Sequence, residues 1–380
     1  MTTFFLFFFL IYGAIHAVVY ARFRALLPPG RPAGLWLALL FLLMILMPVA
    51  SRLLERAHHD GLARVLAWAG FCWMGLVCLA CLAALASWLV QILAWGAARA
   101  GLWTPPAGLA AHLAWTALCL AVLASAYAVV EARGVRVERL AIATDKLPAG
   151  VERLTIAQVS DVHLGLLNGQ RRFSRIVEMI RAEKPDILVS TGDMVDGNLF
   201  EEDGLADLWA GLPAPLGKFA VVGNHEVYAG LGQALEFLRR AGFTVLRDRA
   251  ARPGGLLNVV GVDDPAVFQR RPPELAPPPP PALRPQDLPP GLFTLLLYHR
   301  PVVLPGWAGR FDLQLAGHTH GGQIFPFNLV TGAIYPMQDG LYHLADGSRL
   351  YTSRGTGTWG PPMRLGAPPL ITIFELTRRP

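Results

Sequence analysis

Residues 151–163 read VERLTIAQVSDVH, an apolar run that stops at Asp161 and is followed two residues later by His163. A short apolar run bounded by polar residues predicts a buried strand. Open α/β sheets carry their binding and catalytic groups at the carboxyl ends of their strands. This stretch therefore predicts a strand of an α/β sheet and also the place of its chemistry.

The same arrangement recurs along the chain from about residue 135 onward. Apolar runs that end in Gly, Asp, Asn or His are found at 186–193 (DILVSTGD), 218–226 (KFAVVGNHE), 257–264 (LNVVGVDD), 293–300 (FTLLLYHR) and 312–320 (DLQLAGHTH). Between them, apolar residues of 171–183 recur at helical spacing. Strands that alternate with amphipathic helices indicate an α/β domain.

The strand ends contribute one set of polar side chains. Its members are Asp161, His163, Asp193, Asn224, His225, His299, His318 and His320. Carboxylate and amide oxygens with imidazole nitrogens suit two divalent cations of the Mn, Fe or Zn kind, which a shared carboxylate can hold about 3.5–4 Å apart. A lone His is more often a packing or surface residue than a ligand, but the joint occurrence of this set favours a two-metal site.

Five motifs give the set a family resemblance. They are DVH (161–163), GDMVDG (192–197), GNHE (223–226), YHRP (298–301) and GHTHGGQ (317–323). In order and kind they resemble the calcineurin-like metallophosphoesterase superfamily, and the GVDDP segment (261–265) with the tail 350–376 resembles its YkuE-like branch. The resemblance covers about residues 150–378. It implies a four-layer α/β/β/α sandwich that hydrolyses a phosphomonoester or phosphodiester.

The resemblance also implies a role for each site residue. It assigns Asp161, His163 and His320 to one metal ion, Asn224, His299 and His318 to the other, and Asp193 to a bridge between them. A metal-bridging hydroxide would attack phosphorus. His225 would be the leaving-group acid or a donor to the phosphoryl oxygens, and Glu226 would orient it. GNHE departs from the commoner GNHD of the family, and the longer carboxylate of Glu226 is still expected to reach His225.

Two arginines are further candidates for substrate binding. Arg354 in an SRG turn and Arg300 beside His299 could each clamp a phosphate, although a plain salt bridge is the favoured alternative for both. Asp196 is interpreted as a loop cap. Residues 355–360 match GxGxxG, but Pro361 stands where a helix should begin, which argues against a dinucleotide site. Lysine occurs only three times, so no nucleic-acid partner is expected.

The first third of the chain has a different composition. The chain is 53% hydrophobic and 16% charged, with a net charge of +6. Residues 1–130 contain seven Arg against Glu55 and Asp60, a balance of +5, and the remaining 26 basic and 25 acidic residues give +1. Charge-free runs at 1–21, 32–51, 65–98 and 100–130 predict four transmembrane helices, the last one beginning after Pro106. We expect a membrane domain at 1–132, a linker at 133–149 and a catalytic domain at 150–380 with a Pro-rich loop at 272–290.

The side of the membrane depends on the loop arginines. Six of them flank the ends that share a side with the C-terminal part, against four on the other side, which favours a multi-pass protein of a bacterial inner membrane with a cytoplasmic catalytic domain. The first span taken alone favours the opposite orientation. Membrane lipids are therefore expected partners, and a lipid-linked substrate such as a nucleotide-activated lipid precursor is the favoured hypothesis. The alternatives are a broad phosphatase with a simple anchor, and a membrane receptor or transport accessory that binds metal without turnover.

Overall fold

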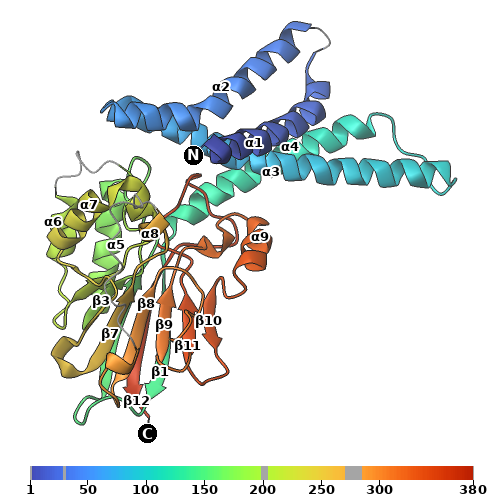
Figure 1. The fold of residues 1–380 in the computed structure, drawn as a ribbon. Coiled ribbons are helices and arrows are strands. Elements are labelled where there is room, and N and C mark those ends of the chain that lie inside the picture. The colour runs from blue at the N-terminus through green and yellow to red at the C-terminus, as the bar shows by residue number, and fades with distance from the viewer. Residues whose placement is uncertain (1, 29–30, 198–203, 270–284, 380) are drawn as a thin grey trace. The chain divides into compact units, whose positions relative to one another are not determined.

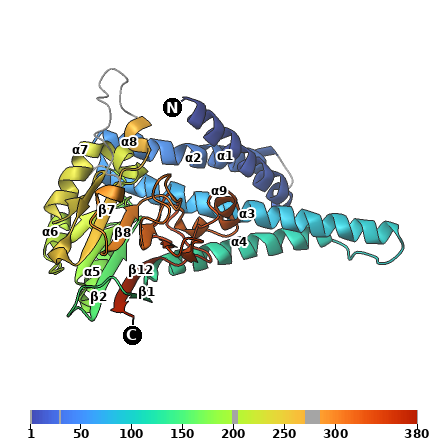
Figure 2. The same ribbon diagram turned by 60° about the horizontal axis from the view of Figure 1, so that its bottom comes forward.

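The apolar runs of the first third form four long helices in the computed structural model of the protein, which describes residues 2–28, 31–197, 204–269 and 285–379 (Figures 1 and 2). The helices are α1 (Thr2–Phe23), α2 (Arg31–Arg56), α3 (Asp60–Arg99) and α4 (Leu109–Arg133), with a 3-10 turn η1 (Arg24–Leu26) after the first. All four contain a segment long and apolar enough to cross a bilayer. The chain therefore has four candidate membrane-spanning helices, as expected.

Polar side chains within these helices bond to one another. His16 of α1 accepts a hydrogen bond at Nε2 from Trp73 of α3 at 2.9 Å. Arg22 donates to Gln91 Oε1 at 2.7 Å. Such pairing is what polar groups at membrane depth require, because no water is there to bond them. These residues thus have a structural explanation within the helical part.

Two compact units make up the chain. One comprises Met1–Val130 with Gly360–Met363, and the other comprises Glu131–Trp359 with Arg364–Pro380. The second unit contains two six-stranded sheets, whose strand orders are β1-β12-β2-β3-β4-β5 and β10-β11-β9-β8-β7-β6. Within the first sheet β2, β3, β4 and β5 are parallel. Within the second sheet β7, β8, β9 and β11 are parallel.

The elements of the second unit follow one another as strands and short helices. The first sheet is built from β1 (Arg136–Thr144), β2 (Arg153–Val159), β3 (Ile187–Ser190), β4 (Lys218–Ala220), β5 (Thr244–Val245) and β12 (Leu370–Arg378). The second is built from β6 (Arg249–Ala251), β7 (Leu257–Val262), β8 (Phe293–Tyr298), β9 (Leu313–Ala316), β10 (Gly340–His343) and β11 (Arg349–Thr352). The α-helices are α5 (Gln170–Glu183), α6 (Leu205–Ala210), α7 (Asn224–Arg240), α8 (Ala266–Gln269) and α9 (Phe327–Ile334). The 3-10 turns are η2 (Pro253–Gly255), η4 (Pro285–Asp287) and η5 (His320–Gly322).

Two apolar layers hold the second unit together. Between the sheets, buried residues such as Ile156 and Val189 of the first sheet pack with Leu295 and Leu315 of the second. Between the first sheet and its helices, the apolar stripe of α5 packs with Trp209 of α6. Figures 1 and 2 show α5, α6 and α7 gathered on one side of the unit. The expected α/β/β/α sandwich, preceded by apolar helices, is confirmed.

The linker expected at 133–149 is wrong in its central part. Residues 136–144 form β1, which pairs in parallel with β12 from Arg136↔Leu370 to Thr144↔Arg378. Val137 packs on the helix side of the sheet, whereas Ile142 is buried between the sheets, as alternation along a strand requires. Four of the nine residues of RVERLAIAT are polar and they do not alternate regularly with the apolar ones, so the sequence pattern alone indicates a strand only weakly. The Pro-rich segment 272–290 lies outside the described residues up to 284, and η4 follows within it.

Candidate metal centre

Loops at the carboxyl ends of five strands carry all eight side chains of the predicted set. Asp161 and His163 follow β2, Asp193 follows β3, Asn224 and His225 begin α7 after β4, His299 follows β8, and His318 and His320 follow β9. These strands are parallel neighbours within their own sheets, so their carboxyl ends lie at one end of the sandwich. The chain thereby brings together residues that are far apart in sequence.

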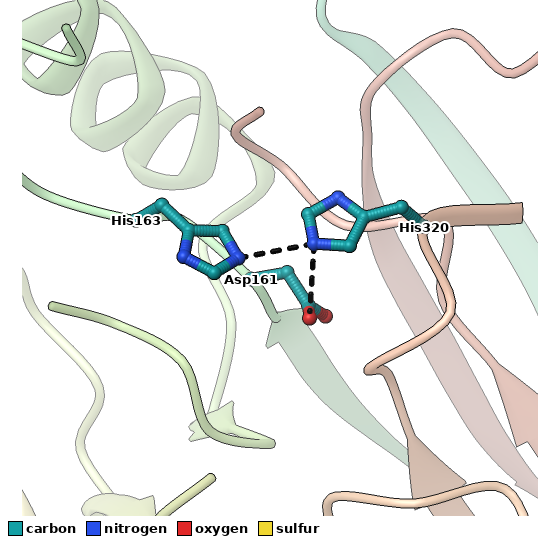
Figure 3. A group of neighbouring side chains, drawn as sticks. All are labelled: Asp161, His163 and His320. Atoms are coloured by element: carbon teal, nitrogen blue, oxygen red, sulfur yellow. Dashed lines mark hydrogen bonds and ion pairs between the residues drawn. The ribbon is translucent and has the colours of Figure 1, made fainter. Parts of the chain in front are cut away.

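Asp161, His163 and His320 form one group (Figure 3). The Nε2 atoms of the two histidines lie 3.0 Å apart, and His320 Nε2 lies 3.5 Å from Asp161 Oδ1. All three side chains are buried. Two nitrogens that bind one cation at about 2.1 Å and at a right angle stand about 3.0 Å apart, so the spacing of the two rings fits a shared ion.

A second group contains Asp193, His299 and His318. His299 Nε2 lies 3.2 Å from Asp193 Oδ2 and 3.2 Å from His318 Nδ1. The same Asp193 oxygen lies 4.0 Å from His163 Nε2 of the first group. Asp193 therefore stands between the two groups, where one carboxylate can serve both.

Asn224 contributes a buried oxygen to this arrangement. Its Oδ1 atom is buried and has no hydrogen-bond partner among the described residues. A buried polar atom left without a partner needs an explanation, and a bound cation is an ordinary one. The donor set of carboxylate, amide oxygen and imidazole, together with this orphaned oxygen, fits a pair of divalent cations.

The backbone is strained at the same residues. Asp161, His163, Asp193, His318 and His320 have φ between 50° and 74°, the left-handed region that residues other than glycine rarely adopt. Such conformations persist where the surrounding structure imposes them, and they cluster at functional sites. The strained turns direct these side chains into a common space at the strand ends.

Neighbouring groups fix the orientation of the imidazole rings. His299 Nδ1 donates to the carbonyl of Thr191 at 2.8 Å, which leaves Nε2 toward Asp193. His318 has Tyr335 OH at 3.2 Å from Nε2, which leaves Nδ1 toward His299. Bonds of this kind orient metal-binding histidines and select their tautomer. Neither Thr191 nor Tyr335 carried a signal in the sequence, because their roles depend on contacts across loops.

His225 has a different partner from the one expected. Its Nδ1 lies 2.5 Å from Asp196 Oδ1, so Asp196, interpreted from sequence as a loop cap, holds the ring. Glu226 was expected to orient His225, and this is a correction. Its fully buried carboxylate instead accepts from the backbone N–H groups of Asp193, Met194, Val195 and Gly223, at 2.6–3.2 Å. The first turn of α7 directs Glu226 back toward the loop after β3, so it braces that loop.

Glycines keep this loop packing possible. A Cβ at Gly223 would collide with the Asp193 carboxylate, and a Cβ at Gly317 would collide with Ser160 and Asp161. The backbone at each position passes directly against a candidate ligand. This explains the glycines that precede Asn224 and His318 in the motifs.

The two arginines proposed as phosphate clamps are engaged with carboxylates. Arg300 bonds to Asp264 at 2.6 and 3.0 Å, and Arg354 pairs with Asp339 at 2.9 Å. This is the salt-bridge alternative for both. A third arginine was missed. Arg364 is fully buried and donates to the carbonyls of His320, Arg354, Gly357 and Ala367, with His320 Nδ1 at 3.1 Å from its Nη2.

Burial and the carboxylates shift the titration of the centre in opposite directions. Burial lowers the pKa of His163 to about 4, and of His318 to about 3. Burial also opposes charge on His225 and His299, but the nearby Asp193 outweighs it and raises their pKa values to about 9 and about 10. Neighbouring rings whose pKa values are shifted in opposite directions are typical of functional centres.

Comparisons with known proteins agree with this geometry. The calcineurin-like phosphoesterase family matches residues 154–322. A protein of Aquifex aeolicus (strain VF5), called an uncharacterized metallophosphoesterase, is 42% identical over 258 residues, or 68% of this chain and 97% of that protein. The uncharacterized metallophosphoesterase YkuE of Bacillus subtilis (strain 168) is 31% identical, covering 62% and 83% of the two chains.

Some relatives extend beyond the shared part. A Danio rerio transmembrane protein with metallophosphoesterase domain is 29% identical over 68% of this chain and 62% of its own length. Relatives from Helicobacter pylori (strain J99 / ATCC 700824) and Campylobacter jejuni are matched over 64% and 61% of their lengths. A solved dimetal phosphatase from Danio rerio has 15% identity and a TM-score of 0.32, over 53% of this chain and 87% of that chain. The sequence relatives, rather than that structure, carry the family assignment.

Proposed function

The chain belongs to the calcineurin-like phosphoesterases, hydrolases of phosphoester bonds, and we propose that it is a membrane-anchored member that works with two divalent cations. The observation that carries the proposal is the sharing of Asp193. Its Oδ2 atom lies 3.2 Å from His299 and 4.0 Å from His163, which belong to different ligand groups. A carboxylate so placed fits a bridge between two ions.

The remaining ligands divide between the ions by proximity. Asp161, His163 and His320 would hold one, and His299, His318 and the orphaned Asn224 oxygen would hold the other. When bound, such ions polarise a phosphoryl oxygen and lower the pKa of water at the site. The mixed oxygen and nitrogen donor set suits Mn, Fe and Zn alike.

His225 supplies the proton chemistry of the proposed reaction. Asp196 accepts the Nδ1 proton, and the ring lies edge-on to His163 with centroids 4.7 Å apart. This places Nε2 beside the first ligand group, where it can donate to a phosphoryl oxygen or to the departing oxygen of the ester. Asp196 acts as a positioning residue, because its hydrogen bond keeps a proton on Nδ1 of His225 and orients the ring.

The substrate is a phosphomonoester or phosphodiester, and we propose that it is lipid-linked. Support comes from the four candidate spans, which keep the catalytic unit attached to a membrane. A nucleotide-activated lipid precursor is one member of this class. The competing function is a receptor or transport accessory that binds metal without turnover. Against it stands the complete ligand set, together with His225 and its partner Asp196.

Replacement of the shared carboxylate tests the proposed chemistry. Asp193→Asn in the full chain is expected to lower Mn-dependent hydrolysis of bis(p-nitrophenyl) phosphate by at least about a hundredfold, because both ions lose a ligand. Asp346→Asn, in an exposed loop, is the matched control and should retain the wild-type rate. Equal rates for Asp193→Asn and wild type would refute the two-ion mechanism. Inactivity of the wild type with every divalent metal tried would favour the receptor.

We also propose that the catalytic unit lies on the cytoplasmic side. Six arginines flank the helix ends that lead to this unit, or lie just after them, at positions 52, 56, 64, 133, 136 and 139. Four lie at the opposite ends. Lys and Arg accumulate in cytoplasmic loops, so the count supports this orientation.

A further inference from the structure

Residues 321–338 form a charge-free segment beside the metal centre. They contain no Asp, Glu, Lys, Arg or His and include α9. Large apolar side chains stand exposed along it, at Phe325, Phe327, Leu329, Val330 and Ile334. Leu329 is 66% exposed and Ile334 is 64% exposed, and no residue of α9 is buried. Single exposed apolar residues are ordinary, but five within ten positions form a patch that indicates a contact surface.

The polar groups of the segment bond inward. Gln338 donates from Nε2 to the carbonyl of Asn328 at 2.9 Å, and its own carbonyl accepts from Thr319 at 2.6 Å. Tyr335 reaches the ligand His318 at 3.2 Å. α9 is therefore tied to the metal centre through its polar side, and its apolar side chains are left to face outward. Figure 1 shows α9 beyond the ends of β9 and β10, at the end of the sheets where β9 leads into the site.

Two exposed aromatic rings lie beside His225 of the centre. Tyr228 and Trp359 are each 51% exposed, and their rings lie 5.3 and 5.6 Å from that of His225. Gln323 of the charge-free segment bonds twice to the backbone of Trp359, at 2.8 and 3.0 Å. Gln323 therefore links the charge-free segment to Trp359, and the exposed apolar residues of 325–334 together with Tyr228 and Trp359 are called the apolar rim below. Tyr and Trp are the residues enriched where proteins meet the membrane interface.

The short connection between α4 and β1 indicates which partner covers the apolar rim. α4, a candidate membrane span, ends at Arg133, and β1 begins at Arg136. With two residues between a span and the first sheet, the catalytic unit cannot leave the neighbourhood of the bilayer. An apolar surface without charges can enter the lipid interface with no cost of moving a charge out of water. A bilayer is therefore the occupant that both observations favour.

We infer that residues 321–338 insert into the bilayer interface and that the metal centre acts on a phosphate ester carried in the headgroup layer of that membrane. The insertion of residues 321–338 into the bilayer does not depend on the proposed enzymatic activity. The substrate class rests on the proposed phosphoesterase function. With α9 and Trp359 inserted in the lipid, the metal centre would face the headgroup layer. The ester would then reach His225 and the cations without leaving the membrane.

A fluorescent label tests the location. A nitrobenzoxadiazole group is attached at Leu329→Cys in the full chain, with the four native cysteines replaced by Ala and the protein reconstituted in phosphatidylcholine vesicles. Doxyl-labelled lipids should quench it strongly, and iodide in water should not. The control is Glu236→Cys on α7, an exposed polar position, which iodide alone should quench. Quenching of position 329 by iodide alone, or shielding from both quenchers by protein, would overturn the inference.

Kinetics test the substrate class. Leu329→Glu with Val330→Glu should raise KM at least about tenfold for a lipid ester presented in phosphatidylcholine vesicles, because two charges oppose insertion. The lipid ester is phosphatidic acid or phosphatidylglycerol, and its soluble counterpart is p-nitrophenyl phosphate or bis(p-nitrophenyl) phosphate. KM for the soluble ester should stay within about twofold of wild type. Equal changes for both esters, or none, would overturn the substrate class. If wild type turns over neither, the proposed function fails, and the label at 329 still decides the location.

Discussion

The protonated form of His225 is stabilised by two nearby carboxylates, those of Asp193 and Asp196. Burial alone would lower the pKa of the ring, but Asp193 and Asp196 outweigh it and raise the pKa to about 9. Asp196 also accepts directly from Nδ1 at 2.5 Å. A ring with this pKa stays protonated through neutral pH, so the acid form is the one available to an ester oxygen.

Removal of the Asp196 charge should narrow the pH range of activity. A general acid works below its pKa and fails above it, so Asp196→Asn, which lowers the pKa of His225, should move the alkaline limb of kcat/KM to lower pH by about one unit or more. The measurement is a pH profile in the presence of Mn, with Asp346→Asn as the control. An alkaline limb at the wild-type position in Asp196→Asn would exclude Asp196 as the partner that sets the proton on His225.

At the residue scale, the strand-end positions were predictable and their second contacts were not. Asp161, Asp193 and His299 end apolar runs, and the period of a strand is visible in sequence. The bond from Asp196 to His225 requires the loop after β3 to turn toward the start of α7, which no local pattern reports. For Glu226 the sequence favoured the wrong contact, because adjacency to His225 says nothing of side-chain direction at a helix N-terminus.

The junction between β4 and α7 shows how one element serves the centre. Gly223 is the N-cap of α7, and a Cβ added to it would meet the Asp193 carboxylate. Gly232 lies in the same helix, is exposed, and has open space around its missing side chain. The two glycines therefore allow the same substitution to be made with opposite effects.

Gly223→Ala should destabilise the protein by about 1–3 kcal/mol, because a methyl group is forced into a packed site, and it should also lower metal content. Gly232→Ala should stabilise it by about 1 kcal/mol, because alanine is the better helix former. Thermal unfolding of the full chain in detergent, with metal analysis of the same samples, checks both. A Gly223→Ala protein with wild-type stability and metal content would contradict the close packing of Gly223 against Asp193.

At the element scale, six strands of the sandwich (β2, β3, β4, β7, β8 and β9) were predicted from sequence, and β1 is among those that were not. β2, β8 and β9 are buried on both faces, so their apolar runs are continuous. β1 lies at the edge of its sheet and has four polar residues among its nine, and its partner β12 is near the other end of the chain. A strand whose only neighbour is so distant leaves little local trace.

On the scale of the whole molecule, two units of unlike composition share one chain. The four helices were predictable because charge-free runs of spanning length are a strong signal. The orientation of the helices depends on a difference of two arginines between the sides, which is a small margin. Sidedness nevertheless decides which phosphate esters the enzyme can meet.

A reporter fused after Pro380 should show the C-terminal end on the cytoplasmic side. Green fluorescent protein, which does not become fluorescent when exported unfolded, should be bright, and alkaline phosphatase, which requires export, should be inactive. A shifted variant provides the control: adding arginines to the loop between α1 and α2 should reduce the fluorescence. Active alkaline phosphatase on the unaltered chain would reverse the orientation and direct the search for substrate outside the cytoplasm.

The place of β12 between β1 and β2 has a consequence for biosynthesis. β1 leaves the ribosome directly after α4, but its register partner Leu370–Arg378 is made among the last residues described. Until then β1 and β2 both present open edges, which invite pairing with other chains. We therefore expect the first sheet to remain incomplete until nearly all of the catalytic unit has been translated, while the nascent chain is already attached to the membrane. A ribosome stalled before residue 370 should therefore leave a protease-sensitive chain, even though the helices that precede β1 are complete.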